Sequence, residues 1–433
     1  MITFNDIIGY EKEKEELMYI CDMIKNSSKY TEKRVYIPRA LLLYGEPGTG
    51  KTTMAKALIN ESGRKCFYCK KNKSNGDFVD EIRNVFEEAK KNAPSIIFLD
   101  DMDKFAEDNL DINSNKEEFA TIQTCMEDLE NAEVFVLATA NDIMYLPESL
   151  LRTGRFGRKM EIGKPDQESI KKLINHFIEL NNIKSDISAE SLSTILANNS
   201  CATIKEILNE AQIYSIYKDK GSISKDEMTK AILKNTCGEI EQTQDKSSYI
   251  YRAIHEAGHA TVALLNGWNV SLVSITSHGE SGGFTRTNGC SNDGDGLGYL
   301  KKELQVALAG KAATELNSLD IVDFGAENDI DKAAEKASYA LRRDLAYGFN
   351  YGYDKRSYDN KQAFSRLDMI TTKTYEILEE SYKEAKKILI DNKNLLEILT
   401  NQLLEHETLL YDDVNCIFNE YIETTYKQEE LVN

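Results

Sequence analysis

The chain has 433 residues, of which 41% are hydrophobic, so it can bury more than one core and should form roughly two to four domains. Its 72 acidic residues outnumber its 53 basic ones and give a net charge of −19. Nucleic-acid phosphates and anionic lipid surfaces would repel such a chain, so we expect no nucleic-acid partner. No apolar run reaches the about 18 residues of a membrane-spanning helix, and the N-terminal residues lack a secretory pattern. We therefore expect a cytoplasmic protein with no transmembrane segment of its own.

The first third of the chain alternates short apolar runs with helical patterns. The runs at Ala40–Tyr44, at Ser95–Leu99 and at residues 134–138 are continuously apolar. Continuous runs of this length are typical of parallel strands that are buried on both faces of a sheet. Residues 1–166 are therefore predicted to form an α/β nucleotide-binding domain.

The pattern changes after residue 166. Residues 167–238 lack strand patterns and carry apolar residues at helical spacing, which predicts a small all-helical domain. Residues 239–248 are polar and are predicted to be a linker. Residues 249–433 are predicted to form a second, mostly helical folded unit.

Eight residues after the first predicted strand fit the phosphate-binding pattern G-x-x-x-x-G-K-[ST]. They lie between a strand and a helix, which is the setting that this pattern requires. The glycines let backbone N–H groups curl around phosphate oxygens at the positive end of the helix. The lysine is expected to reach the β- and γ-phosphates, and the last threonine to bind Mg²⁺. The eight residues are Gly45, Glu46, Pro47, Gly48, Thr49, Gly50, Lys51 and Thr52.

Polar residues follow two further predicted strands. Asp100 and Asp101 end one strand, and Asn141 comes just after another. A carboxylate at the tip of a neighbouring strand can hold Mg²⁺, and we assign that role to Asp100. Asp101 is then expected to face the attacking water, which Asn141 would help to orient. Each residue alone is as easily a capping or turn residue, whereas the set together is more specific.

A zinc-binding pattern, H-E-x-x-H, lies in an apolar helical segment. Because positions i and i+4 share one helix face, His255 and His259 can bind the same ion. Glu256 can then take a proton from water at the metal. A hydrolytic zinc site needs a third protein ligand, and spacing alone leaves that ligand open. The candidates are His278, Glu315, Glu327, Asp329, Asp331 and His406.

From Thr3 onward, the order and spacing of these motifs resemble the FtsH-type AAA+ zinc metalloproteases. The resemblance implies an α/β fold class: an AAA+ P-loop ATPase domain with a parallel sheet and a helical lid, followed by a mostly helical zincin-type peptidase domain. It implies Zn²⁺, ATP and Mg²⁺ as cofactors. The implied function is an ATP-dependent zinc endopeptidase that unfolds and degrades protein substrates in a ring, normally a homo-hexamer. The family carries transmembrane helices ahead of the ATPase domain, so this chain is expected to be a divergent form without them.

The resemblance also implies roles in the ATPase part. Residues 150–158 are similar to the family's second region of homology, which makes Arg155 and Arg158 arginine fingers that reach the ATP of a neighbouring subunit. Asp101 stands where the family has glutamate, so its carboxylate is one methylene shorter. The segment after residue 70 lacks the family's aromatic pore loop, for which Phe78-Val79 is the nearest substitute.

In the peptidase part, residues 324–329 are similar to the segment that supplies the family's third zinc ligand, which selects Asp329. Glu315 would orient a ligand. The strand at residues 272–276 would be the edge strand on which an extended substrate pairs.

Two alternative functions stay open, and the first of them follows from the departures in the ATPase part. One is a zinc peptidase on a nucleotide-binding but weakly hydrolysing scaffold. The other is a protein-remodelling ATPase with a silent protease.

Overall fold

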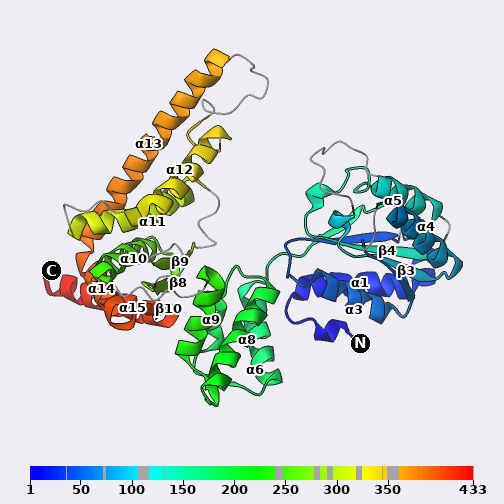
Figure 1. The fold of residues 1–433 in the computed structure, drawn as a ribbon, viewed down its shortest axis with the longest axis horizontal. Coiled ribbons are helices and arrows are strands. Elements are labelled where there is room, and N and C mark those ends of the chain that lie inside the picture. The colour runs from blue at the N-terminus through cyan, green and yellow to red at the C-terminus, as the bar shows by residue number, and fades with distance from the viewer. Residues whose placement is uncertain are drawn as a thin grey trace. The chain divides into compact units, whose positions relative to one another are not determined.

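A computed structural model describes most of the chain, which divides into two compact units, Met1–Ser224 and Lys225–Asn433 (Figure 1). His278 and most of the expected linker lie outside the described residues. The domain boundaries expected at residues 166, 238 and 248 stay a prediction. The described residues are 1–35, 37–71, 75–105, 117–130, 132–238, 247–276, 283–289, 296–317, 324–343, 345–348 and 360–432.

The first unit is built on a five-stranded sheet with the order β2-β3-β4-β1-β5, and every neighbouring pair is parallel. The predicted α/β class is therefore confirmed. The strands are β1 (Ala40–Tyr44), β2 (Lys65–Cys69), β3 (Ser95–Leu99), β4 (Val134–Ala140) and β5 (Arg158–Glu161). The helices are α1 (Glu11–Lys25), α2 (Ser27–Glu32), α3 (Lys51–Ser62), α4 (Asn75–Lys91) and α5 (Glu117–Asp128), with short 3₁₀ helices at Phe4–Asp6, Met102–Lys104 and Ile143–Tyr145.

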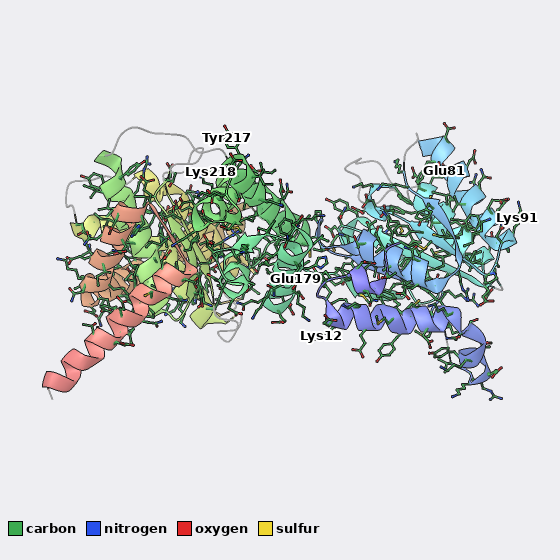
Figure 2. The ribbon with its side chains drawn as sticks, turned by 90° about the horizontal axis from the view of Figure 1, so that it is seen from below. Lys12, Glu81, Lys91, Glu179, Tyr217 and Lys218 are labelled. Atoms are coloured by element: carbon green, nitrogen blue, oxygen red, sulfur yellow. The ribbon has the colours of Figure 1, made fainter. Side chains whose placement is uncertain are left out.

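Helices cover both faces of this sheet. Leu41 and Leu43 of β1 pack into the core beneath α1 and α3, whereas Leu42 packs into the core beneath α4 and α5. Alternate residues of a strand point to opposite faces, so a strand buried on both sides must be apolar at every position. Charged side chains such as Lys12 of α1 and Lys91 of α4 point away from the sheet (Figure 2).

Phe78 and Val79 belong to the core beneath α4. Both side chains are buried, and the Phe78 ring makes an edge contact with the Phe105 ring at 4.9 Å between centroids. A substrate-gripping loop must expose its aromatic residue. The interpretation of Phe78-Val79 as a substitute pore loop is therefore wrong.

A mostly helical group completes the first unit. The prediction of an all-helical domain is wrong in one respect, because residues 184–185 and 222–223 pair as a short parallel sheet that is too short to leave a sequence pattern. Helix α6 packs against α7 and α8, and residues at helical spacing, such as Ile204 and Leu208, form its core. The N-terminal end of α8 touches the phosphate loop, because the Ala202 N–H donates to the Gly48 carbonyl at 3.0 Å. The elements are α6 (Gln167–Leu180), β6 (Lys184–Ser185), α7 (Ala189–Ile195), α8 (Cys201–Tyr217) and β7 (Ser222–Ile223).

The second unit is mostly helical, as predicted, with one small antiparallel sheet. Its core lies between α10, α11, α14 and strand β8. None of the described helices is both long enough and apolar enough to cross a membrane. The elements are α9 (Lys225–Cys237), α10 (Ser247–Leu265), β8 (Asn269–Ser274), β9 (Phe284–Asn288), α11 (Leu297–Asn317), α12 (Glu327–Arg342), α13 (Asn360–Asp391), α14 (Lys393–His406), β10 (Thr408–Leu410) and α15 (Tyr411–Val432), with a 3₁₀ turn at Phe324–Ala326.

The order of the small sheet is β10-β8-β9. Strand β8 therefore has a neighbour on each side, and the strand expected at residues 272–276 is not an edge strand. The residues of β10, which come much later in the chain, pair with it and occupy that edge. Among the described residues, the edge strand on the other side is β9.

Helices α10 and α11 lie so close together where they cross that their backbones are nearly in contact. A Cβ at Gly258 would lie 2.5 Å from Ala313 Cβ and 2.7 Å from the Ala309 carbonyl oxygen. Only glycine fits at such a distance, because the obstructing atoms belong to a helix and cannot rotate away.

We expect Gly258→Ala to force α10 and α11 apart and to lower the free energy of unfolding of the second unit by about 1–3 kcal/mol, the usual cost of overpacking. Chemical denaturation of the zinc-loaded protein measures the change. The matched control is Gly298→Ala in α11, where a Cβ meets nothing within 4 Å and alanine should be neutral or slightly stabilising. Equal stabilities of the two variants would contradict the close packing.

Candidate metal centre and nucleotide site

The phosphate-binding pattern forms a loop between β1 and α3, as its sequence setting requires. Gly45, Gly48 and Gly50 all have positive φ angles, 142°, 79° and 100°, which turn the backbone N–H groups into a cradle. The Lys51 ammonium donates to the Gly45 and Glu46 carbonyls at 2.7 and 2.8 Å. Burial lowers the pKa of Lys51. The loop carbonyls thus hold the Lys51 ammonium beside the backbone N–H groups, where a phosphate would bind.

The expected Mg²⁺ ligands lie next to each other at the tip of β3. Thr52 Oγ1 donates to Asp100 Oδ1 at 3.1 Å, and Thr139 Oγ1 donates to the same oxygen at 2.8 Å. The Thr139 hydroxyl also accepts the Asp101 N–H at 2.9 Å. Thr139 follows directly after the apolar run at residues 134–138 and belongs to β4, so no motif marked it, yet it fixes both aspartates.

Asp101 carries two lysine partners. Its Oδ2 lies 3.0 Å from Lys104 Nζ and 3.3 Å from Lys70 Nζ. Burial alone would raise the pKa of Asp101, but the two ammonium groups outweigh it and lower that pKa. Lys70 also reaches Asp100 Oδ2 at 3.1 Å. The carboxylate expected to face the attacking water is thus ionised and held by cations.

Asn141 is held by an aspartate that the sequence reasoning missed. The Asn141 N–H donates to Asp103 Oδ1 at 3.0 Å, and its side-chain amide lies 3.3 Å from Asp103 Oδ2. The spacing Asp-Asp-x-Asp after a buried strand was the available signal. Asp103 orients Asn141 at the same sheet edge as Asp100.

Both expected arginine fingers have acidic partners within the chain. Arg155 pairs with Glu127 of α5, and Arg158 lies 3.1 Å from Glu16 of α1. The side chains are 18% and 32% exposed, respectively, so Arg158 is the more accessible of the two.

The zinc-binding pattern lies within helix α10, as predicted. His259 Nδ1 is 2.7 Å from the Val306 carbonyl oxygen of α11. Because a carbonyl can only accept, Nδ1 carries the proton and Nε2 presents a lone pair. The neighbouring helix thereby sets the tautomer that a metal ligand needs.

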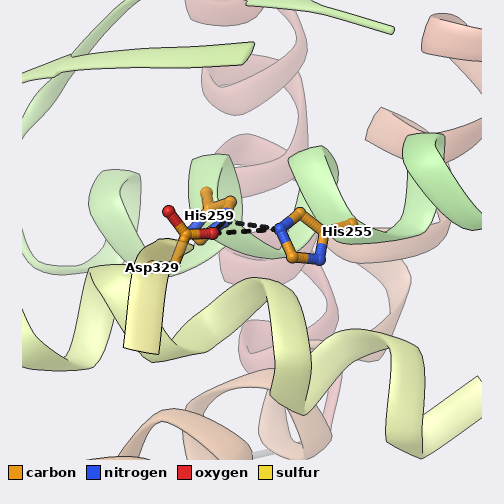
Figure 3. Close-up of side chains that lie close together, drawn as sticks. All are labelled: His255, His259 and Asp329. Carbon is orange, nitrogen blue, oxygen red and sulfur yellow. Dashed lines mark hydrogen bonds and ion pairs between the residues drawn. The ribbon is translucent and has the colours of Figure 1, made fainter. Parts of the chain in front are cut away.

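Three ligand atoms converge at this point (Figure 3). His255 Nε2, His259 Nε2 and Asp329 Oδ2 form a triangle with sides of 3.1, 3.2 and 3.2 Å. Donor atoms around a tetrahedral zinc ion lie about 3.3 Å apart, given metal–ligand bonds of roughly 2.0–2.1 Å. A lone pair aimed at a carboxylate is repulsive unless a cation lies between them. The donor set and its spacing therefore fit zinc.

The other candidates for third ligand lie elsewhere, so far as the described residues show. Within the described residues, the His, Cys, Asp and Glu side chains that lie close enough together to hold a metal are those of His255, His259 and Asp329. His406 ends α14 with an exposed side chain beside Glu405. Glu315 bonds Lys311 and Tyr382 instead of a zinc ligand, so the orienting role expected of it is wrong.

Space for the ion depends on Gly310 of α11, a residue that the sequence reasoning did not single out. A Cβ there would lie 2.5 Å from His255 Nε2 and 2.5 Å from His259 Nε2. The histidine rings therefore rest on bare backbone. The small-residue run around Gly310 was the available signal, but such runs more often indicate helix packing.

Glu256 lies beside the triangle and is 6% exposed. Its Oε2 accepts a hydrogen bond from Thr285 Oγ1 of β9 at 2.5 Å. Burial raises the pKa of Glu256, although His259 and His255 oppose this effect. A raised pKa makes the carboxylate a stronger proton acceptor. The arrangement thus places a buried carboxylate of raised pKa beside three atoms that could hold a metal.

We expect Asp329→Ala to lose bound zinc, because two imidazoles alone do not complete the site. The readout is zinc content after gel filtration, measured by inductively coupled plasma mass spectrometry. Glu327→Ala, two residues away on α12 and exposed, is the matched control and should keep about one zinc per chain. Zinc retained by Asp329→Ala but lost by Glu327→Ala would reverse the assignment.

Comparison with protein families matches both halves of the chain. Residues 41–164 match the AAA family, ATPases associated with various cellular activities, and residues 242–417 match peptidase family M41. The first range contains the phosphate loop and the two arginines, and the second contains the metal triangle and Glu256.

Individual relatives align with nearly the whole chain. The ATP-dependent zinc metalloprotease FtsH 2 of Thermoanaerobacter sp. is 30% identical, over 97% of this chain and 83% of its own length. FtsH 3 of Synechocystis sp. is 30% identical, over 96% and 73%. FtsH of Mycoplasmoides gallisepticum is also 30% identical, over 96% of this chain, which spans only 57% of that relative. The chain therefore belongs to the FtsH family of ATP-dependent zinc metalloproteases.

Proposed function

We propose that the chain is an ATP-dependent zinc endopeptidase that unfolds and degrades protein substrates in a homo-hexameric ring. The observation that carries the peptidase part is the triangle of His255, His259 and Asp329 with Glu256 beside it. These residues would hold Zn²⁺. When bound, zinc supplies a Lewis acid that polarises a carbonyl and increases the acidity of water. The cytoplasmic location stays a prediction.

In the reaction, Glu256 takes the proton of the attacking water and passes it to the leaving amine. Its burial supports this role, because the raised pKa favours proton uptake. An extended substrate adds as a strand to the edge of β9, whose Thr285 contacts Glu256. Pairing at β9 would bring the scissile bond to the general base.

In the ATPase part, Lys51 and the loop glycines bind the phosphates of ATP, and Thr52 and Asp100 hold Mg²⁺. Asp101 and Asn141 orient the attacking water. Support comes from their common position at one edge of the sheet. We assign residues 1–166 to the nucleotide-binding domain, residues 167–238 to its lid and residues 249–433 to the peptidase domain.

Arg155 and Arg158 act in the ring by reaching the ATP of the neighbouring subunit. To do so they must leave Glu127 and Glu16. Ion pairs near the surface are worth about 0–1 kcal/mol, so this exchange costs little against binding to a triphosphate.

We expect Glu256→Gln to reduce cleavage of casein by at least about 100-fold, which is the lower range for loss of a general base. Zinc content should be unchanged, because Glu256 is not a ligand in this assignment. Glu327→Gln, an exposed carboxylate near Asp329, is the control and should cleave normally. Casein cleavage by Glu256→Gln at the wild-type rate would show that another group activates the water.

We expect degradation of a folded substrate to require hydrolysis of ATP, because pulling a chain apart consumes free energy. The rates with ATP, ADP and a non-hydrolysable analogue, measured with one fluorescent folded substrate, test this. Lys51→Ala should lose both ATPase activity and folded-substrate degradation, whereas Lys56→Ala, exposed on the same helix, should keep both. Equal rates with all three nucleotides would instead support the weakly hydrolysing scaffold.

A further inference from the structure

Strand β9 holds the carboxylate of Glu256 in place. Thr285 Oγ1 lies 2.5 Å from Glu256 Oε2 and 3.3 Å from the Glu256 carbonyl oxygen. The Thr285 hydroxyl has one proton to donate. It donates this proton to the Glu256 carboxylate, because that contact is the shorter of the two. A charge-assisted bond of this kind is stronger than one between neutral groups.

The other side of the carboxylate rests on the backbone of Gly283. A Cβ at that position would lie 2.4 Å from Glu256 Oε1 and 2.8 Å from its Cγ. Glu256 therefore lies between a hydroxyl and bare backbone, both from the segment that begins β9. The two metal-site histidines and Glu256 all lie on α10. The contacts that hold the Glu256 carboxylate come from a different element, the segment that begins β9.

We propose that Thr285 is a positioning residue for Glu256, and that its hydroxyl selects the side-chain conformation in which the carboxylate faces water at the metal. The proposal rests on the peptidase function proposed above. A purely structural hydroxyl would affect stability, whereas a positioning hydroxyl affects the chemical step. Loss of a residue that orients a side chain of a metal site typically lowers activity about 10- to 100-fold.

Three variants test the proposal in the full chain with zinc bound and ATP present. Thr285→Val keeps the branched shape and removes only the hydroxyl, and Thr285→Ser keeps the hydroxyl. Thr400→Val makes the same exchange in α14, where the hydroxyl donates to the Leu396 carbonyl at 2.7 Å, and is the matched control. The substrate is a short fluorogenic peptide, which needs no unfolding.

We expect Thr285→Val to lower kcat about 10- to 100-fold with KM and zinc content unchanged, and Thr285→Ser to restore most of kcat. Thr400→Val should match the wild type. The proposal is overturned if Thr285→Val keeps the wild-type kcat, if both valine variants lose kcat equally, or if the serine variant is as slow as the valine variant.

Crystal structures of zinc-loaded wild type and Thr285→Val separate this proposal from the proposed function. The wild type should show one Glu256 conformation at the Thr285 hydroxyl, and the variant should show Glu256 turned away or in several conformations. An unchanged Glu256 in the variant would overturn the positioning role. A wild type that binds zinc but cleaves no peptide would instead count against the peptidase function.

Discussion

The metal site depends on the close approach of helices α10 and α11. Gly258 lets the two backbones touch, and Gly310 leaves room for the imidazoles of His255 and His259. At this distance the Val306 carbonyl of α11 reaches the His259 ring and sets its tautomer. Side chains larger than glycine at either position would separate the helices or fill the space for the ion, and the three donor atoms would not converge.

The nucleotide site depends on a comparable constraint at the edge of the parallel sheet. One hydroxyl, that of Thr139, bonds both Asp100 and the backbone of Asp101. The consecutive aspartates therefore differ in their other partners, Thr52 for Asp100 and Lys104 for Asp101, whereas Lys70 bridges both carboxylates. Asp101 adopts a left-handed backbone conformation, φ 56°, which aspartate tolerates better than most residues.

Local patterns predicted the fold class, the phosphate loop and the zinc-binding helix because the physics behind them is local. A continuous apolar run indicates a strand that is buried on both faces, and i, i+4 spacing indicates a shared helix face.

The third ligand was chosen by resemblance, since Asp329 is 70 residues from His259 and no local rule connects them. Its carboxylate does lie with the two histidines in the structure. Thr285, Gly310 and Thr139 escaped notice because each acts through a residue far away in sequence. The edge-strand interpretation failed for the same reason: β10 pairs with β8 from the far end of the chain.

Anomalous diffraction at the zinc edge, from crystals of the full chain grown with zinc, tests the account most directly. The account predicts one strong peak within bonding distance of His255 Nε2, His259 Nε2 and an oxygen of Asp329, with Glu256 beside it but not bound to it. A peak held by other residues, or no peak between the two histidines, would contradict it.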